Sequence, residues 1–102
     1  MTAALPQAVS APVNAVLEIE VNNHPGVMSH VVGLFSRRAY NVEGIVCLPV
    51  GDGDTSRIWL LVNEDDRLPQ MMRQIDKLED VLTVRRHAPG HAVFERLEEY
   101  FR

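Results

Sequence analysis

A change in the spacing of apolar residues around Asn23 constrains the fold of this chain more than any other feature. From Ala15 to Val21 apolar and polar residues alternate, which is typical of a strand with one wetter face. After Gly26 the apolar residues recur at the spacing of one buried helical face. They are Val27, Val31, Leu34 and Phe35. The segment from Asn23 to Gly26 is therefore predicted to be a corner where a strand ends and a helix begins.

This corner has the chemistry of a site for a small carboxylate. Pro25 suits a first helical position, because the amide that it lacks would have no partner inside the helix. Because Gly26 has no side chain, a ligand can approach the amides of Gly26, Val27 and Met28, where the helix dipole favours negative charge. An ordinary strand-to-helix corner would use the same Pro-Gly pair. On the local sequence alone, the ordinary corner is the favoured interpretation.

The next two strands follow the helix expected over residues 25–38. Residues 41–50 predict a second strand, in which Gly44 marks a bulge or a close approach and Pro49 is tolerable only at an edge or a strand end. Residues 51–55 have the composition of a hairpin loop. Residues 57–63 predict a third strand that is apolar on both faces, which a sheet with one open side would not require. We therefore expect a partner to cover the second face, near Trp59 and Leu61.

The C-terminal half predicts a second helix, a fourth strand and a short third helix. Asp65 or Asp66 can cap the second helix, whose apolar stripe includes two methionines that are expected to fill the core. The fourth strand is predicted over residues 81–87, with Leu82 and Val84 pointing inward. Residues 91–102 carry apolar residues at helical spacing and predict an amphipathic helix.

The order strand, helix, strand, strand, helix, strand predicts an α+β fold of the ferredoxin-like βαββαβ type, with a four-stranded antiparallel sheet and two helices on one face. Residues 1–14 are expected to form a flexible leader, residues 15–88 the domain, and residues 89–102 a C-terminal amphipathic segment. The other face of the sheet would be uncovered within one copy. A homodimer that joins sheets or shares a face is the simplest way to cover it.

Composition narrows the function. The chain of 102 residues has ten basic and fourteen acidic residues, a formal net charge of −4, and no basic cluster longer than a pair. Nucleic acid is therefore an improbable partner, because its binding depends on concentrated Lys and Arg. No run of about 18 apolar residues predicts a membrane span. The single cysteine, Cys47, cannot form an internal disulfide, which suits a reducing cytoplasm. We expect a cytoplasmic protein.

No motif of a catalytic or metal site is present in the sequence. It contains no nucleophile motif and no Gly-rich phosphate loop with its Lys, and its four histidines are scattered. The acidic run Glu64-Asp65-Asp66 is interpreted as a solvated loop and helix cap. Asn41 could accept a hydrogen bond from the ammonium of an amino acid whose carboxylate lies at Gly26. Taken alone, Asn41 is better explained by turn chemistry.

Three segments together resemble a known family. The stretch Asn-His-Pro-Gly-Val-Met-x-His-Val-x-Gly-Leu-Phe-x-Arg-Arg-x-x-Asn-Val-Glu-Gly from Asn23 to Gly44 is followed by Ile-Trp-Leu-Leu-Val-Asn at 58–63 and Gln-Ile-Asp-Lys-Leu-Glu-Asp-Val at 74–81. These segments closely resemble the small regulatory subunit of acetohydroxyacid synthase, also called acetolactate synthase, in its short form. That subunit is an ACT domain. The resemblance spans about residues 16–86.

The resemblance implies a regulatory and non-catalytic role. The family's subunit binds and activates the large catalytic subunit and makes it sensitive to feedback inhibition by valine, in branched-chain amino acid biosynthesis. The thiamine diphosphate, FAD and magnesium belong to that catalytic subunit, so no cofactor is expected here. Carried over by motif, the effector-binding positions are Asn23, Gly26, Val27 and Met28 at the turn of one ACT domain and Asn41 at the second strand of another. A freestanding amino acid sensor of the same fold, without an enzyme partner, is the alternative.

The segment of residues 89–102 has two possible roles. The longer members of the family carry a second domain after the ACT unit, and we expect none here, so the surface that contacts the catalytic subunit is not defined by the resemblance. The C-terminal segment could contact the catalytic subunit, or it could pack on the open sheet face of its own dimer. The sequence favours neither.

Overall fold

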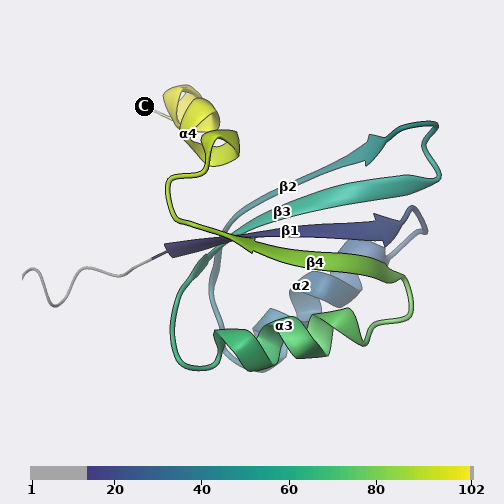
Figure 1. Ribbon diagram of the computed structural model, residues 1–102, viewed down its shortest axis with the longest axis horizontal. Coiled ribbons are helices and arrows are strands. Elements are labelled where there is room, and N and C mark those ends of the chain that lie inside the picture. The colour runs from purple at the N-terminus through teal and green to yellow at the C-terminus, as the bar shows by residue number, and fades with distance from the viewer. Residues whose placement is uncertain (1–13, 102) are drawn as a thin grey trace, which may run out of the picture.

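The computed structural model describes residues 14–101, which form one four-stranded sheet and its covering helices. The elements in order are β1 (Asn14–Asn22), α2 (Val27–Arg37), β2 (Val42–Val50), β3 (Thr55–Asn63), α3 (Leu68–Asp76), β4 (Val81–His87), α4 (Ala92–Glu98) and the 3-10 turn η1 (Glu99–Phe101). All neighbouring strands are antiparallel, in the order β2-β3-β1-β4. Helices α2 and α3 lie on one side of the sheet and α4 lies near one end on the other (Figure 1). The predicted βαββαβ arrangement is confirmed. Of the predicted leader, only Asn14 lies within the described residues.

The hydrophobic core lies between the sheet and helices α2 and α3. Alternate residues of β1 and β3 face the two helices, as the period-two pattern predicts. From α2 the core receives the four residues of the predicted stripe, and α3 adds Leu68, Met71 and Ile75. Phe35 has no exposed surface, and burying a side chain of this kind stabilises the fold by about 1.5–3 kcal/mol. The core therefore holds the strand-to-helix corner on a rigid base.

Two sequence predictions about element ends are wrong in detail. Leu82 does not point inward but is 48% exposed, because the register of β1 and β4 shifts between Glu20 and Val21 and places Val81 against the core instead. The N-cap of α3 is Arg67, without a side-chain cap. Asp65 instead stabilises the turn before the helix, because its carboxylate accepts from the amide of Arg67 at 2.7 Å. This hydrogen bond holds the pKa of Asp65 below its usual value.

The edge strand β2 follows its predicted features. Among the described residues β2 pairs with β3 alone, so Pro49 lies on an edge strand, where proline is tolerated. The register between β2 and β3 shifts between Val42 and Gly44, which is the predicted bulge. A Cβ added at Gly44 would lie 2.9 Å from the ring of Phe94. Only glycine therefore allows the C-terminal segment to approach β2 this closely.

The expectation that one copy leaves the second sheet face uncovered is wrong in part, because the C-terminal segment of the same chain covers some of it. Val16 is on that face and has no exposed surface. Beside it, the ring of Trp59 lies 5.5 Å from that of His87 and 4.7 Å from that of His91. The side chain of His91 also caps α4 by accepting from the amide of Val93 at 3.1 Å. The cluster thus anchors the beginning of α4 to the sheet.

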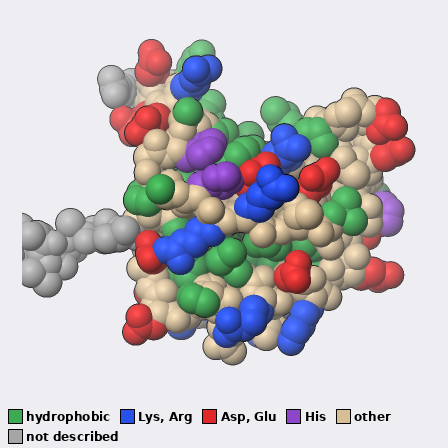
Figure 2. Space-filling model, viewed as in Figure 1, with side chains coloured by type: hydrophobic (Ala, Val, Ile, Leu, Met, Phe, Trp, Pro, Cys, Tyr) green, Lys and Arg blue, Asp and Glu red, His purple; other side chains and the backbone are tan. Residues whose placement is uncertain are grey.

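Charged pairs lie beside the same cluster. The carboxylate of Glu18 accepts from the ring nitrogen Nε2 of His87 at 2.8 Å and pairs with Nε of Arg57 at 3.2 Å. Figure 2 shows histidine, basic and acidic side chains gathered over this part of the sheet, next to α4. Within residues 14–101, no helix is long and apolar enough to cross a membrane. In the same range no cluster of three or more His, Cys, Asp or Glu could hold a metal ion.

Candidate functional site

The strand-to-helix corner is a tight turn that precedes α2 and does not belong to it. Gly26 is the N-cap, with φ 85° and ψ −6°, and the helix begins at Val27. These angles match the third position of a type II turn, which requires a positive φ and commonly has proline just before it. The amide of Val27 closes the turn by donating to the carbonyl of His24 at 3.3 Å. The prediction that Pro25 is the first helical residue is therefore wrong, because Pro25 serves the turn.

This geometry changes the set of amides that a ligand can use. The amide of Val27 is engaged in the turn, so it is not free as the sequence suggested. Within the described residues, no group accepts from the amides of Gly26 and Met28. Both lie at the positive end of the α2 dipole, where an anion is favoured. A Cβ at Gly26 would meet nothing within 4 Å, which leaves the backbone open to a ligand.

A small cavity of about 260 Å³ opens beside the turn. It is lined by residues of the turn, including the predicted Asn23, Gly26 and Met28, and by the apolar side chains of Val27 and Ile58. Ligand pockets for drug-sized molecules run to about 300–1,000 Å³. The cavity is therefore suited to a small metabolite with an anionic head and a short apolar group.

Asn23 ties the turn to the loop between β2 and β3. Its backbone amide donates to the carbonyl of Asp54 at 2.9 Å, and its side-chain Nδ2 donates to the carbonyl of Gly53 at 2.8 Å. With Nδ2 engaged in this way, the carbonyl oxygen Oδ1 has no partner in the part of the chain that the structure describes. Asn23 can therefore both support the turn and offer an acceptor to a ligand.

Asn41 does not join the other four predicted residues within one chain. It is exposed and precedes β2, next to the buried Tyr40, whose hydroxyl donates to the carbonyl of Asn63. Cys47, which lines the cavity, is six residues further along β2. At about 3.3 Å per residue, roughly 20 Å separates the two ends of this run. Only a second chain could bring an Asn41 side chain to the cavity.

Among the residues of the cavity wall that sequence reasoning missed are Cys47 and Ser56, on neighbouring strands. Cys47 pairs with Ile58 across β2 and β3, and Ser56 is a buried polar residue on the same face of β3. Burial raises the pKa of the Cys47 thiol above its usual value. The alternation along the two strands could have identified these residues, because it places both on the sheet face that α2 covers. The pairing registers of β2 and β3 were also needed, because they decide which residues of the two strands lie beside the cavity.

Comparison with sequence families and relatives gives a consistent result. A family model described as AHAS small subunit-like ACT domain matches residues 17–83. The acetolactate synthase isozyme 1 small subunit of Escherichia coli K12 is 59% identical over 88 residues, which cover 86% of this chain and 92% of that protein. The isozyme 3 small subunit of the same strain is 39% identical over 70 residues, which cover 68% of this chain and 43% of the longer protein.

Solved structures agree with the fold. The small subunit of acetolactate synthase from Thermotoga maritima aligns with a TM-score of 0.66 and 25% identity, over 86% of this chain and 68% of that one. The ACT domain of the GTP pyrophosphokinase of Chlorobium tepidum aligns with a TM-score of 0.63 and 24% identity, over 76% of this chain and 100% of that one.

Proposed function

The chain belongs to the family of acetolactate synthase small subunits, in its short form with one ACT domain, and on that premise we propose that it senses valine in a site shared by two copies. As a member of this family it is the non-catalytic regulatory subunit, and its partner is the catalytic large subunit. The thiamine diphosphate, FAD and magnesium of the enzyme reside on that large subunit. Membership favours the enzyme-bound role over the freestanding sensor. A cytoplasmic location is part of the proposal.

The cavity at the turn is the observation that carries the valine proposal. The carboxylate of valine accepts from the amides of Gly26 and Met28, both of which lack an acceptor within the described residues. Its isopropyl group lies against the apolar lining residues Val27 and Ile58. Its ammonium group donates to the free Oδ1 of Asn23, and the Asn41 of a second copy supplies another oxygen. Charge-assisted hydrogen bonds of this kind are the strong ones.

A homodimer that pairs two β2 edges would complete this site. Within residues 14–101 no strand pairs with the outer edge of β2, so another strand can use the amides and carbonyls of that edge. Antiparallel pairing of β2 with its copy brings the beginning of one strand next to the end of the other. It therefore carries Asn41 of one copy toward the turn of its partner. The proposed dimer thus removes the separation of roughly 20 Å that keeps Asn41 from the cavity in one chain.

Regulation then requires that valine bind one arrangement of the dimer more tightly than another. Only such a difference can pass a signal to the catalytic subunit, and the coupling is typically about 1–3 kcal/mol, or roughly 5–150-fold in affinity. Through this coupling the subunit activates the enzyme when valine is absent and inhibits it when valine is abundant.

Calorimetric titration of the purified chain tests the site. We expect valine to bind, and we expect sedimentation to show a dimer that valine stabilises. Leucine and isoleucine, titrated in parallel, define the preference. A folded chain that takes up no valine at millimolar concentration, or binds it as a monomer, would refute the shared site. Co-purification with the large subunit separates the enzyme-bound role from the freestanding sensor.

A further inference from the structure

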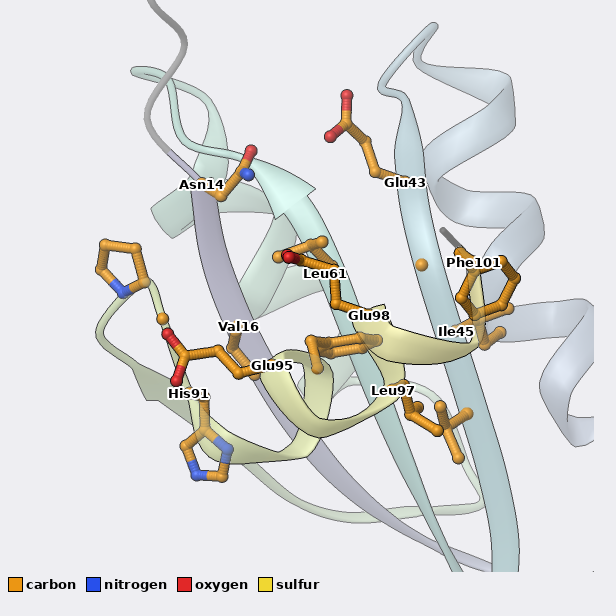
Figure 3. Close-up of a pocket in the computed structure, with 15 residues that line it drawn as sticks. Asn14, Val16, Glu43, Ile45, Leu61, His91, Glu95, Leu97, Glu98 and Phe101 are labelled. Carbon is orange, nitrogen blue, oxygen red and sulfur yellow. The ribbon is translucent and has the colours of Figure 1, made fainter.

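A second and larger cavity lies on the opposite side of the sheet from α2 and α3. It has a volume of about 770 Å³ and lies between the C-terminal segment and the open face (Figure 3). The sheet contributes Val16 and Leu61 to its walls, and the segment contributes Phe94, Leu97 and Phe101. We call this cavity the C-terminal groove.

The C-terminal segment packs on the sheet incompletely. Phe94 is fitted closely against Gly44, yet no residue of α4 or η1 is buried. Phe101 lines the groove and is 84% exposed. Exposed aromatic side chains beside an apolar cleft are the usual sign of an interaction surface. The ring of Phe94 and the His91 cap therefore hold the segment in place, while its apolar side stays available to a binding partner.

Charge decides which partner suits the groove. Three carboxylates line it, those of Glu43, Glu95 and Glu98, and among residues 14–101 no lysine or arginine does so (Figure 3). A second copy of this chain in the same groove would bring like carboxylates together about the twofold axis, which is unfavourable. A partner segment with basic side chains would meet opposite charge.

We propose that the C-terminal groove receives an apolar segment of the catalytic large subunit that carries lysine or arginine residues. The proposal rests on the enzyme partnership stated above. Leu97 and Phe101 supply apolar contact, and the carboxylates select basic flanking residues and fix their position. Strands β1, β2 and β3 line both this groove and the valine cavity, from opposite faces. The sheet is thus the element through which the two sites can communicate.

A pair of neighbouring aromatic residues tests the apolar contact. Phe101 lines the groove and Tyr100 does not, although the two are 84% and 83% exposed. Biolayer interferometry with the large subunit of the same organism gives the affinity, and the synthase assay gives the activation. Phe101→Ala is expected to weaken binding at least about tenfold, as for an aromatic contact at the centre of an interface. Tyr100→Ala is expected to remain within about twofold of the parent. Equal affinities of the two variants would overturn the proposal.

A matched pair of charge reversals tests the selection of basic residues. Glu95 lines the groove and Glu99 does not, so Glu95→Lys and Glu99→Lys alter the net charge equally. Glu95→Lys should weaken binding and flatten its dependence on salt, whereas Glu99→Lys should do neither. Thermal unfolding of each variant checks that the fold is retained. Identical salt dependence in the two variants would contradict the assignment.

Two further measurements separate this proposal from the other occupant and from the valine site. If Phe101→Ala dissociates the homodimer in sedimentation but leaves the affinity for the large subunit unchanged, a second copy occupies the groove and the proposal is wrong. Calorimetry with valine is expected to be unchanged in Phe101→Ala. Failure of the parent chain to bind valine, with the effect of Phe101→Ala intact, would remove the sensing function alone. Failure of the parent chain to bind the large subunit would overturn both.

Discussion

Replacing Gly26 by Asp and by Asn separates the charge of the proposed carboxylate site from its shape. The backbone at Gly26 has φ 85°, and no atom lies within 4 Å of an added Cβ. Steric overlap is therefore absent and the backbone strain is the main cost. Asn and Asp are the residues that tolerate this left-handed region best, so each variant should lose about 1 kcal/mol of stability. For a domain of this size that corresponds to a decrease in Tm of about 4–8 °C.

The two variants should differ in valine binding. A carboxylate at position 26 would lie about 5 Å from the carboxylate of a ligand bound to the turn. Coulomb repulsion at that distance is about 0.8 kcal/mol in bulk water and about 3 kcal/mol at an effective dielectric constant of 20. Gly26→Asp is thus expected to bind valine roughly 4–160-fold more weakly than Gly26→Asn. Isothermal titration calorimetry at low salt measures the ratio, and added salt should reduce it.

Two results would refute the carboxylate site at the turn. Equal affinity of the Asp and Asn variants for valine would show that no negative group of the ligand approaches the turn. If Gly26→Asp bound valine as tightly as the parent chain, the site would lie elsewhere. A loss of folding in the Asp variant alone would contradict the strain argument, because Asn meets the same backbone.

Three further predictions concern the two strands and the C-terminal segment. Asn41→Ala should weaken valine binding by about 1.5–3 kcal/mol, the value of a hydrogen bond to a charged group, and leave the Tm unchanged; calorimetry and thermal unfolding check both. Because burial raises the pKa of the Cys47 thiol, alkylation of the native chain should be slow at neutral pH and faster at alkaline pH. Valine at roughly ten times its Kd should slow that alkylation about tenfold, and an unchanged rate would argue against occupation of the cavity beside Cys47. Gly44→Ala places a Cβ 2.9 Å from the ring of Phe94, so α4 should move off the sheet at a cost of about 1–3 kcal/mol. Faster chymotrypsin cleavage after Phe94 and a change in Trp59 fluorescence would record this, and parent-like cleavage would contradict it.

Most of the fold could be predicted because each element carries its own period. The alternation in β1 and the stripe of α2 identify their core residues without further information. Gly44 and Pro49 mark the bulge and the edge strand, because glycine and proline restrict what a strand can do. The exposed Leu82 was not predictable, since a register shift in a neighbouring strand decides which residue of β4 meets the core.

The candidate site was only partly predictable, for two physical reasons. A Pro-Gly pair fits the beginning of a helix and the centre of a type II turn equally well, so the engagement of the Val27 amide became visible only in the structure. Asn41 and the turn belong to opposite ends of the sheet, and local sequence carries no information on how a second copy would unite them. The position of α4 likewise depends on a contact between Phe94 and Gly44, which are fifty residues apart in the sequence.

Because Asn41 and the turn of one chain lie too far apart to share a ligand, the valine affinity of the proposed sensor depends on the concentration of the protein itself. If half of the ligand contacts come from each of two molecules, the apparent affinity for valine falls when the protein is diluted below the dissociation constant of the pair. A cell that makes little of this subunit would then respond to valine later than one that makes much. The set point of feedback would follow from gene dosage as well as from the chemistry of the cleft.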